Sequence, residues 1–149
     1  MNRIVRMNLD GTIISQFGAE GPKPGEFNEA IDVVLTPDKR EMYVYDASNQ
    51  RVQRLTLDGN LIRQWKTVEI PGRDGGRLTV DPAGQLYEAS PVTKEIIVYN
   101  PENKIIAKWA QPESDGPTAV YIDGQNNLYV TYAESGVVRI FRLSPQKTS

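Results

Sequence analysis

Short apolar-rich runs separated by turn residues fill the whole chain. The runs are rich in Val, Ile, Tyr and Thr, which is the composition of β-strands. Asp-Gly pairs at 10–11, 58–59 and 123–124 separate neighbouring runs, and such pairs favour tight hairpins because glycine readily takes positive φ. No stretch free of Gly and Pro has the helical period of apolar positions. The pattern predicts an all-β chain of antiparallel hairpins.

The same pattern recurs along the chain, which indicates a repeat protein. Residues 3–17, 51–65 and 95–109 align without a gap, each copy ends in Phe or Trp, and a fourth copy begins at Val137. Two further sets of segments recur in the same register, and they are 31–37, 77–82 and 119–124, followed by 41–46, 85–90 and 127–132. Each unit of 40-odd residues therefore holds four short strands.

Four antiparallel strands per unit are typical of a β-propeller blade, with a parallel β-solenoid as the competing repeat fold. We expect one propeller segment over 1–149, made of a partial blade 3–17, blades 31–66 and 77–110, and a partial blade 118–143. The expected strands are 3–9, 12–17, 31–36, 42–46, 51–57, 61–66, 77–81, 86–90, 95–100, 104–110, 118–123, 127–132 and 137–143. They amount to three and a quarter blades, an incomplete ring.

The unit from Tyr43 to Gly59 resembles an NHL repeat, through its Tyr-Val-x-Asp strand, its Asn-x-Arg-Val-Gln turn and its Asp-Gly. The glycine-spaced connector that ends at Phe27 resembles the connector between NHL blades. The other two units replace the Asp-x-x-Asn-x-Arg signature. The resemblance implies a six-bladed propeller used as an interaction scaffold. Lactonase-like and low-density-lipoprotein-receptor-type propellers share the weaker features.

Composition excludes several classes of chemistry. The chain has no Cys and no His, which excludes disulfides, thiolate or imidazole metal ligands and Ser-His triads within it. The histidine-bound zinc of the NHL-type amidating lyase therefore cannot be carried over. A net charge of −2 gives no field that attracts nucleic acid. No signal peptide or transmembrane segment is seen, so the cytoplasm is the default location, or an extracytoplasmic one if the chain is a fragment of a surface protein.

Three polar residues close together in the sequence are interpreted as stabilising a turn. Asp46, Asn49 and Arg51 have the spacing of a tight turn, in which Asp and Asn bind backbone groups and the arginine pairs with a carboxylate. A ligand site is the alternative. The aromatic residues that end the outer strands, Phe17, Trp65 and Trp109, are read as packing between blades, with stacking on sugars or bases as the alternative.

Five carboxylates raise the question of a metal site. Lactonase-like propellers hold a divalent ion, which would be calcium here, with inward-facing carboxylates. Because Asp is enriched where strands enter turns, we interpret these residues as turn-forming and expect no metal site or cofactor. They are Asp32, Asp81, Glu88, Asp115 and Asp123.

The connectors at 18–30, 67–76 and 111–117 should open on one face with the turns between the middle strands of each blade, and that face usually binds partners. Arg73 and Arg77 bracket Asp74 and two glycines and could hold an anion, although this is not a phosphate-loop motif. The candidate binding residues on this face are Asn28, Glu29, Arg73, Asp74, Arg77, Asp115 and Tyr132.

The sequence predicts a non-enzymatic propeller segment that binds a protein or peptide partner, since no catalytic set of residues is visible. The alternatives are part of a lactonase- or lyase-like enzyme, RNA binding, and a sensory or adhesive domain of a larger surface protein. An open arc exposes its end strands, so we also expect a homodimer that closes the ring. Two copies hold two strands more than six blades need, so residues 3–9 or 137–143 would be displaced.

Overall fold

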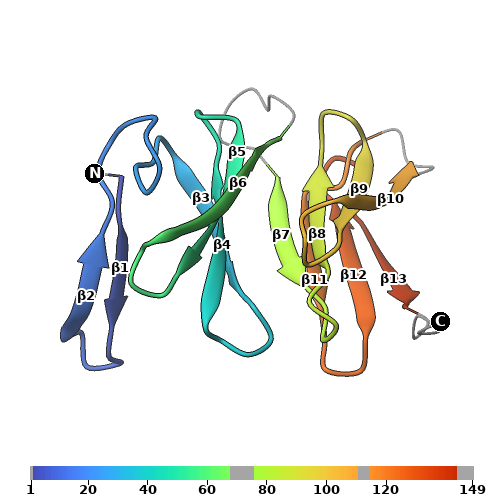
Figure 1. The fold of residues 1–149 in the computed structure, drawn as a ribbon. Helices are drawn as coiled ribbons and strands as arrows, with labels where there is room; N and C mark the ends of the chain where they lie inside the picture. Colours follow the sequence, from blue (N-terminus) through green and yellow to red (C-terminus); the bar gives the residue numbers. More distant parts are fainter. Residues whose placement is uncertain (1, 68–75, 111–114, 144–149) are drawn as a thin grey trace.

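The structure is a computed structural model that describes residues 2–67, 76–110 and 115–143. The described residues form thirteen strands and no helix (Figure 1). The strands are β1 (Ile4–Met7), β2 (Ile13–Phe17), β3 (Ala30–Leu35), β4 (Glu41–Asp46), β5 (Arg51–Thr56), β6 (Leu61–Lys66), β7 (Arg77–Val80), β8 (Leu86–Ser90), β9 (Glu95–Tyr99), β10 (Ile105–Ala110), β11 (Ala119–Ile122), β12 (Asn127–Tyr132) and β13 (Val137–Arg142). Every expected strand is present. The largest difference is the first, which was expected at 3–9 and is shorter at both ends.

The strands form four antiparallel sheets that stand side by side, each a propeller blade or part of one (Figure 1). The first blade is the hairpin β1–β2. The second (β3–β6) and the third (β7–β10) are complete, and the fourth has three strands (β11–β13). The predicted fold class is confirmed, and the ring is not closed.

One turn type joins strands in at least five places. In each, the carbonyl of the first turn residue accepts from the amide three positions later, and its own amide donates to the carbonyl four positions later. The fourth residue of the turn has positive φ. Gly11 and Gly59 take that position, as their Asp-Gly pairs predicted. The prediction is wrong for Gly124, because in that turn the positive φ of 65° falls on Asn126. Asparagine tolerates this conformation better than most residues.

The core lies between the blades rather than within a single sheet. Trp65 of the second blade packs against Tyr43 of its own blade and Tyr99 of the third, with ring centroids 6.0 and 5.6 Å apart. Trp109 packs on Tyr87 in the same way, at 6.0 Å. Phe17 packs against the buried cluster that joins the first and second blades. The repeated aromatic residues therefore stack the blades, as the sequence predicted.

The blades present two ends with different connections (Figure 1). At the upper end, which we call the loop face, the connectors between blades meet the turns of the middle strands, and backbone amides of residues 47 and 48 bind the carbonyls of Glu29 and Asn28. At the opposite end, the hairpin face, lie the other hairpins. Among the described residues, no helix is long and apolar enough to cross a membrane.

Candidate functional site

The predicted turn residues of the second blade hold the connector that precedes it. Arg51 is 7% exposed and its Nε donates to Asp46 Oδ2 at 2.8 Å. The remaining guanidinium donors reach Gln64 Oε1 and the carbonyls of Pro22, Lys23 and Glu26, at 2.7 to 2.9 Å. All five N–H groups of the arginine are thus used.

The carboxylate of Asp46 is the second centre of this network. It is fully buried and accepts from the Asn28 backbone amide at 2.6 Å and from Asn49 Nδ2 at 2.9 Å, besides Arg51. Asn49 also donates to the Gly21 carbonyl. These polar groups are therefore directed at one another and at the connector that precedes the blade.

The predicted loop-face residues do not form one site. Glu29 binds the Ser48 hydroxyl at 2.6 Å, and Asp115 accepts from the backbone amides of residues 134 and 135, so both fasten the loop face. Arg77 opens β7, and Arg73 and Asp74 lie outside the described residues. The prediction that Tyr132 lies on an open binding face is wrong, because it is 1% exposed in the core between the third and fourth blades.

The turn carboxylates are occupied by backbone groups. Asp81 accepts from the amide of Gln85 at 2.8 Å. Asp123 accepts from Asn127 through both its side chain and its backbone amide, and these bonds lower the pKa of Asp123 to about 2. The turn-forming interpretation is wrong for Asp32, which lies within β3 and accepts from the amide of Leu78 in the next blade at 2.7 Å. Among the described residues no three carboxylates gather in a group that could hold a metal ion, so this part of the chain does not fit one.

Glu88 differs from the other carboxylates because it is fully buried between two blades. Its Oε2 accepts from the Tyr99 hydroxyl at 2.7 Å, whereas its Oε1 has no partner within the described residues. Burial raises the pKa of Glu88, and the nearby hydroxyls of Tyr99 and Tyr45 and the charge of Lys108 oppose that shift. Glu88 is therefore a buried carboxyl whose nearest polar groups are tyrosine hydroxyls of two blades.

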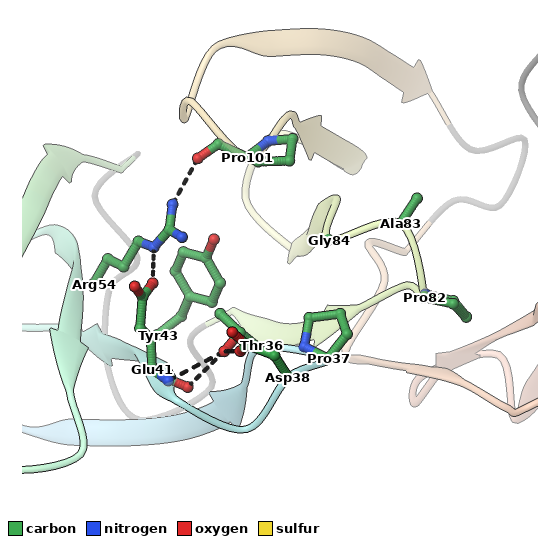
Figure 2. Close-up of a pocket in the computed structure, with 10 residues that line it drawn as sticks. All are labelled: Thr36, Pro37, Asp38, Glu41, Tyr43, Arg54, Pro82, Ala83, Gly84 and Pro101. Atoms are coloured by element: carbon green, nitrogen blue, oxygen red, sulfur yellow. Dashed lines mark hydrogen bonds and ion pairs between the residues drawn. The ribbon is translucent and has the colours of Figure 1, made fainter. Parts of the chain in front are cut away.

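A cavity of about 300 Å³ opens on the hairpin face between the second and third blades (Figure 2). We call it the hairpin pocket. Three hairpins bring its residues together: the β3–β4 turn, the β7–β8 turn and the β9–β10 turn, while β4 and β5 form its wall. The lining residues are Thr36, Pro37, Asp38, Glu41, Tyr43, Arg54, Pro82, Ala83, Gly84 and Pro101.

Arg54 ties the two blades together at this pocket. Its Nε donates to Glu41 Oε2 at 2.6 Å and its Nη1 to the Pro101 carbonyl at 2.6 Å, and Figure 2 shows it spanning from one blade to the other. Its guanidinium also lies 5.5 Å from the Tyr43 ring centre. Arg63 donates to the carbonyl of Glu102 in the same hairpin of the third blade. The pocket wall is therefore fastened from both blades.

Asp38 is the second carboxylate that lines the pocket. Its Oδ1 accepts from the Thr36 hydroxyl at 2.7 Å and from the Arg40 amide at 3.1 Å, and these bonds together with the charge of Arg40 lower the pKa of Asp38. Glu41 is paired with Arg54, whereas Asp38 forms no ion pair with a described residue. The sequence pattern did not indicate this site. The aligned Pro37 and Pro82 in the repeated turns were the available signal.

A family model ties the chain to known proteins. The model for the SMP-30/gluconolactonase/LRE-like region matches residues 32–134, more than half of the chain. The chain belongs to this family. The finer NHL assignment and the number of six blades remain predictions. SMP-30/gluconolactonase/LRE-like membership agrees with the blades described above and with the lactonase-like features of the sequence.

Individual relatives match only in part. Peptidyl-glycine alpha-amidating monooxygenase A of Xenopus laevis is 32% identical over 91 residues, and the match covers 58% of this chain and 10% of that protein. The chain thus spans about a tenth of this curated relative.

Solved structures share the fold of this family member. A virginiamycin B lyase from Staphylococcus aureus matches with a TM-score of 0.61 and 16% identity, covering 97% of this chain and 50% of that one. A calcium-binding protein, regucalcin, from Agrobacterium tumefaciens matches with a TM-score of 0.51 and 20% identity, covering 67% and 36%. At these identities the likeness concerns the fold.

Proposed function

We propose that the chain is a non-enzymatic propeller segment and that its hairpin pocket binds a protein or peptide partner. The observation that carries this proposal is the pocket itself, which two complete blades build together and Arg54 fastens across their boundary. A concave surface with a few fixed polar groups is the usual form of a binding site. On the loop face, by contrast, Asp46, Asn49 and Arg51 bond to backbone groups of the chain itself.

The lining favours a basic side chain of an extended peptide. Pro37, Pro82 and Pro101 offer apolar ring surface, against which the aliphatic stem of a lysine or arginine can pack. The ionised carboxylate of Asp38, which forms no ion pair with a described residue, would pair with the charged end. The chemistry of the pocket therefore selects a peptide that combines a cation with apolar neighbours.

Replacing Asp38 by asparagine should weaken binding of a basic peptide. Labelled heptapeptide pools with arginine fixed at the centre, and matched pools with glutamate there, would be titrated against the chain by fluorescence anisotropy. We expect the arginine pool alone to bind, and D38N to bind it roughly threefold to tenfold more weakly because one charge of the site is lost.

A matched control is available in another hairpin. Asp10 is also an exposed turn aspartate that accepts a backbone amide, but it lies outside the pocket, so D10N should bind like the wild type. Equal binding of the arginine and glutamate pools, or equal losses in D38N and D10N, would contradict this assignment of the pocket.

Family membership supports a second candidate, part of a lactonase- or lyase-like enzyme with a divalent ion in the central channel. Since the described residues offer no set of ligands, such a site would need groups from elsewhere. Calorimetric titration of the chain with calcium chloride and with zinc chloride is the test. The scaffold proposal expects no saturable heat from either, whereas a stoichiometric site for one of them would favour the enzyme reading.

A further inference from the structure

The C-terminal blade exposes a face that other blades cover. Val138 of β13 is 61% exposed, whereas its repeat equivalents Val52 and Ile96 are fully buried. Ile140 is 63% exposed, whereas its equivalent in the third blade, Val98, is 2% exposed and its equivalent in the second blade, Arg54, reaches the Pro101 carbonyl of the blade that follows. In the inner blades these side chains pack against the blade that follows. The outer face of the fourth blade therefore has the side chains of a blade interface, and no described residue covers it.

The N-terminal end exposes the complementary face. Val33 of β3 is 51% exposed, whereas its equivalents Leu78 and Val120 are 5% and 8% exposed because a preceding blade packs on them. Leu35 is 44% exposed beside it. An apolar groove of about 370 Å³ lies here, between β1–β2 and the second blade, with Phe17 in its wall. The groove occupies the place of the two inner strands that the first blade lacks.

We propose that a second copy of this chain covers these faces, with the three-stranded C-terminal blade of one copy docked into the N-terminal groove of the other. The same contact occurs twice within the chain. Val52, the equivalent of Val138, belongs to one buried cluster with Leu78, the equivalent of Val33. Ile96 and Val120 are together in the next cluster in the same way. Each copy carries one exposed face of each type, so two reciprocal contacts close a ring. This interface is separate from the hairpin pocket, which lies within one copy.

The strand count fixes how the junction is made. The described residues of two copies hold 26 strands, and the six blades that the NHL resemblance implies hold 24, so one strand is surplus at each junction. The surplus strand is β1, which has four residues and pairs with β2 at four positions. The six-residue β13 pairs with β12 in an unbroken register. Strand β13 therefore takes the place of β1 and pairs with β2 of the second copy, which completes a four-stranded blade and leaves the number of strand pairings unchanged.

Sedimentation of the purified chain tests the docking. We expect a closed dimer at micromolar concentration, and a monomer for the variant Val138→Lys, because both equivalents of Val138 are fully buried and an ammonium group buried there is unfavourable. Ile62→Lys places the same charge on the outer strand β6, where Ile62 is 44% exposed, and should remain a dimer. A monomeric wild type, or open-ended oligomers, would overturn the proposal.

Disulfide cross-linking tests the exchange of strands. The chain has no cysteine of its own, so only the introduced pair can form a disulfide. Ile140 is the repeat equivalent of Arg6, which faces Ser15 across the β1–β2 pair. The variant Ile140→Cys, Ser15→Cys should form a covalent dimer on oxidation, whereas Arg6→Cys, Ser15→Cys should cross-link poorly within one chain. Efficient cross-linking of the second pair together with none of the first in a dimer would overturn the exchange.

Discussion

Replacing Arg51 by methionine should lower the free energy of unfolding by about 3–5 kcal/mol, the usual cost of removing one partner from a buried ion pair. The substitution leaves Asp46 buried without its cation and removes the donors for the carbonyls of Pro22, Lys23 and Glu26. Unsatisfied buried groups are costly because the protein offers them no replacement for water. Urea denaturation followed by tryptophan fluorescence gives the measurement.

Two further variants separate the network from charge alone. Arg51→Lys keeps the charge but has three donors and no planar fork, so its loss should fall between those of the wild type and methionine. Arg54→Met removes a similar pair that is partly exposed, with Arg54 and Glu41 side chains 21% and 28% exposed, and should cost about 1 kcal/mol. A loss for Arg51→Met no larger than that for Arg54→Met would show that the connector is held by other contacts.

The strands could be predicted from the sequence because the repeat supplied several independent views of one unit. The blade of β3–β6 has clear Asp-Gly and strand signals, and alignment carried these to β7–β10, where Ser90 replaces the signature aspartate. The hairpin at Asp123-Gly124 was predicted, but its residue of positive φ was not, because that conformation falls on Asn126 rather than on the glycine. Local signals thus located the turn but not its strained residue.

The candidate site could be predicted only where it is local. Asp46 and Arg51 lie five positions apart on facing strands of one hairpin, so their spacing in the sequence predicted that they pair. The hairpin pocket joins Arg54 to the Pro101 carbonyl, 47 positions away, and depends on how two blades stack. Tyr132 was expected on the open loop face, yet stacking of the fourth blade on the third buries it.

Glu88 is the second case in which stacking decides the chemistry. From the sequence it was one of several acidic residues in turns and strands, but β4 of the neighbouring blade brings Tyr45 beside it, and Tyr45 in turn donates to Thr67 at 3.2 Å. The two tyrosine hydroxyls and the distant charge of Lys108 are the polar groups that oppose its desolvation. No local spacing could have indicated a buried carboxyl between blades.

Glu88→Gln should make the protein more stable than the wild type at high pH and equally stable in acid. The raised pKa means that the folded state binds a proton more tightly than the unfolded state, in which the pKa is near its usual 4.5. The favourable contribution is therefore complete below about pH 4.5 and is lost as pH rises through the folded pKa. Glutamine keeps an acceptor for Tyr99 but cannot ionise. The free energy of unfolding of the variant should therefore exceed that of the wild type by about 1–3 kcal/mol at pH 8.

The test is a series of urea unfolding curves from pH 4 to pH 8 on both proteins. Glu95→Gln is the matched control, because Glu95 lies on β9 with its side chain 25% exposed and 3.9 Å from Lys108. We expect its stability difference from the wild type to stay flat across this range, since an exposed pair is weak and well solvated. A Glu88→Gln profile parallel to that of the wild type would contradict the assignment, because it would mean that the buried carboxyl does not change its protonation on folding.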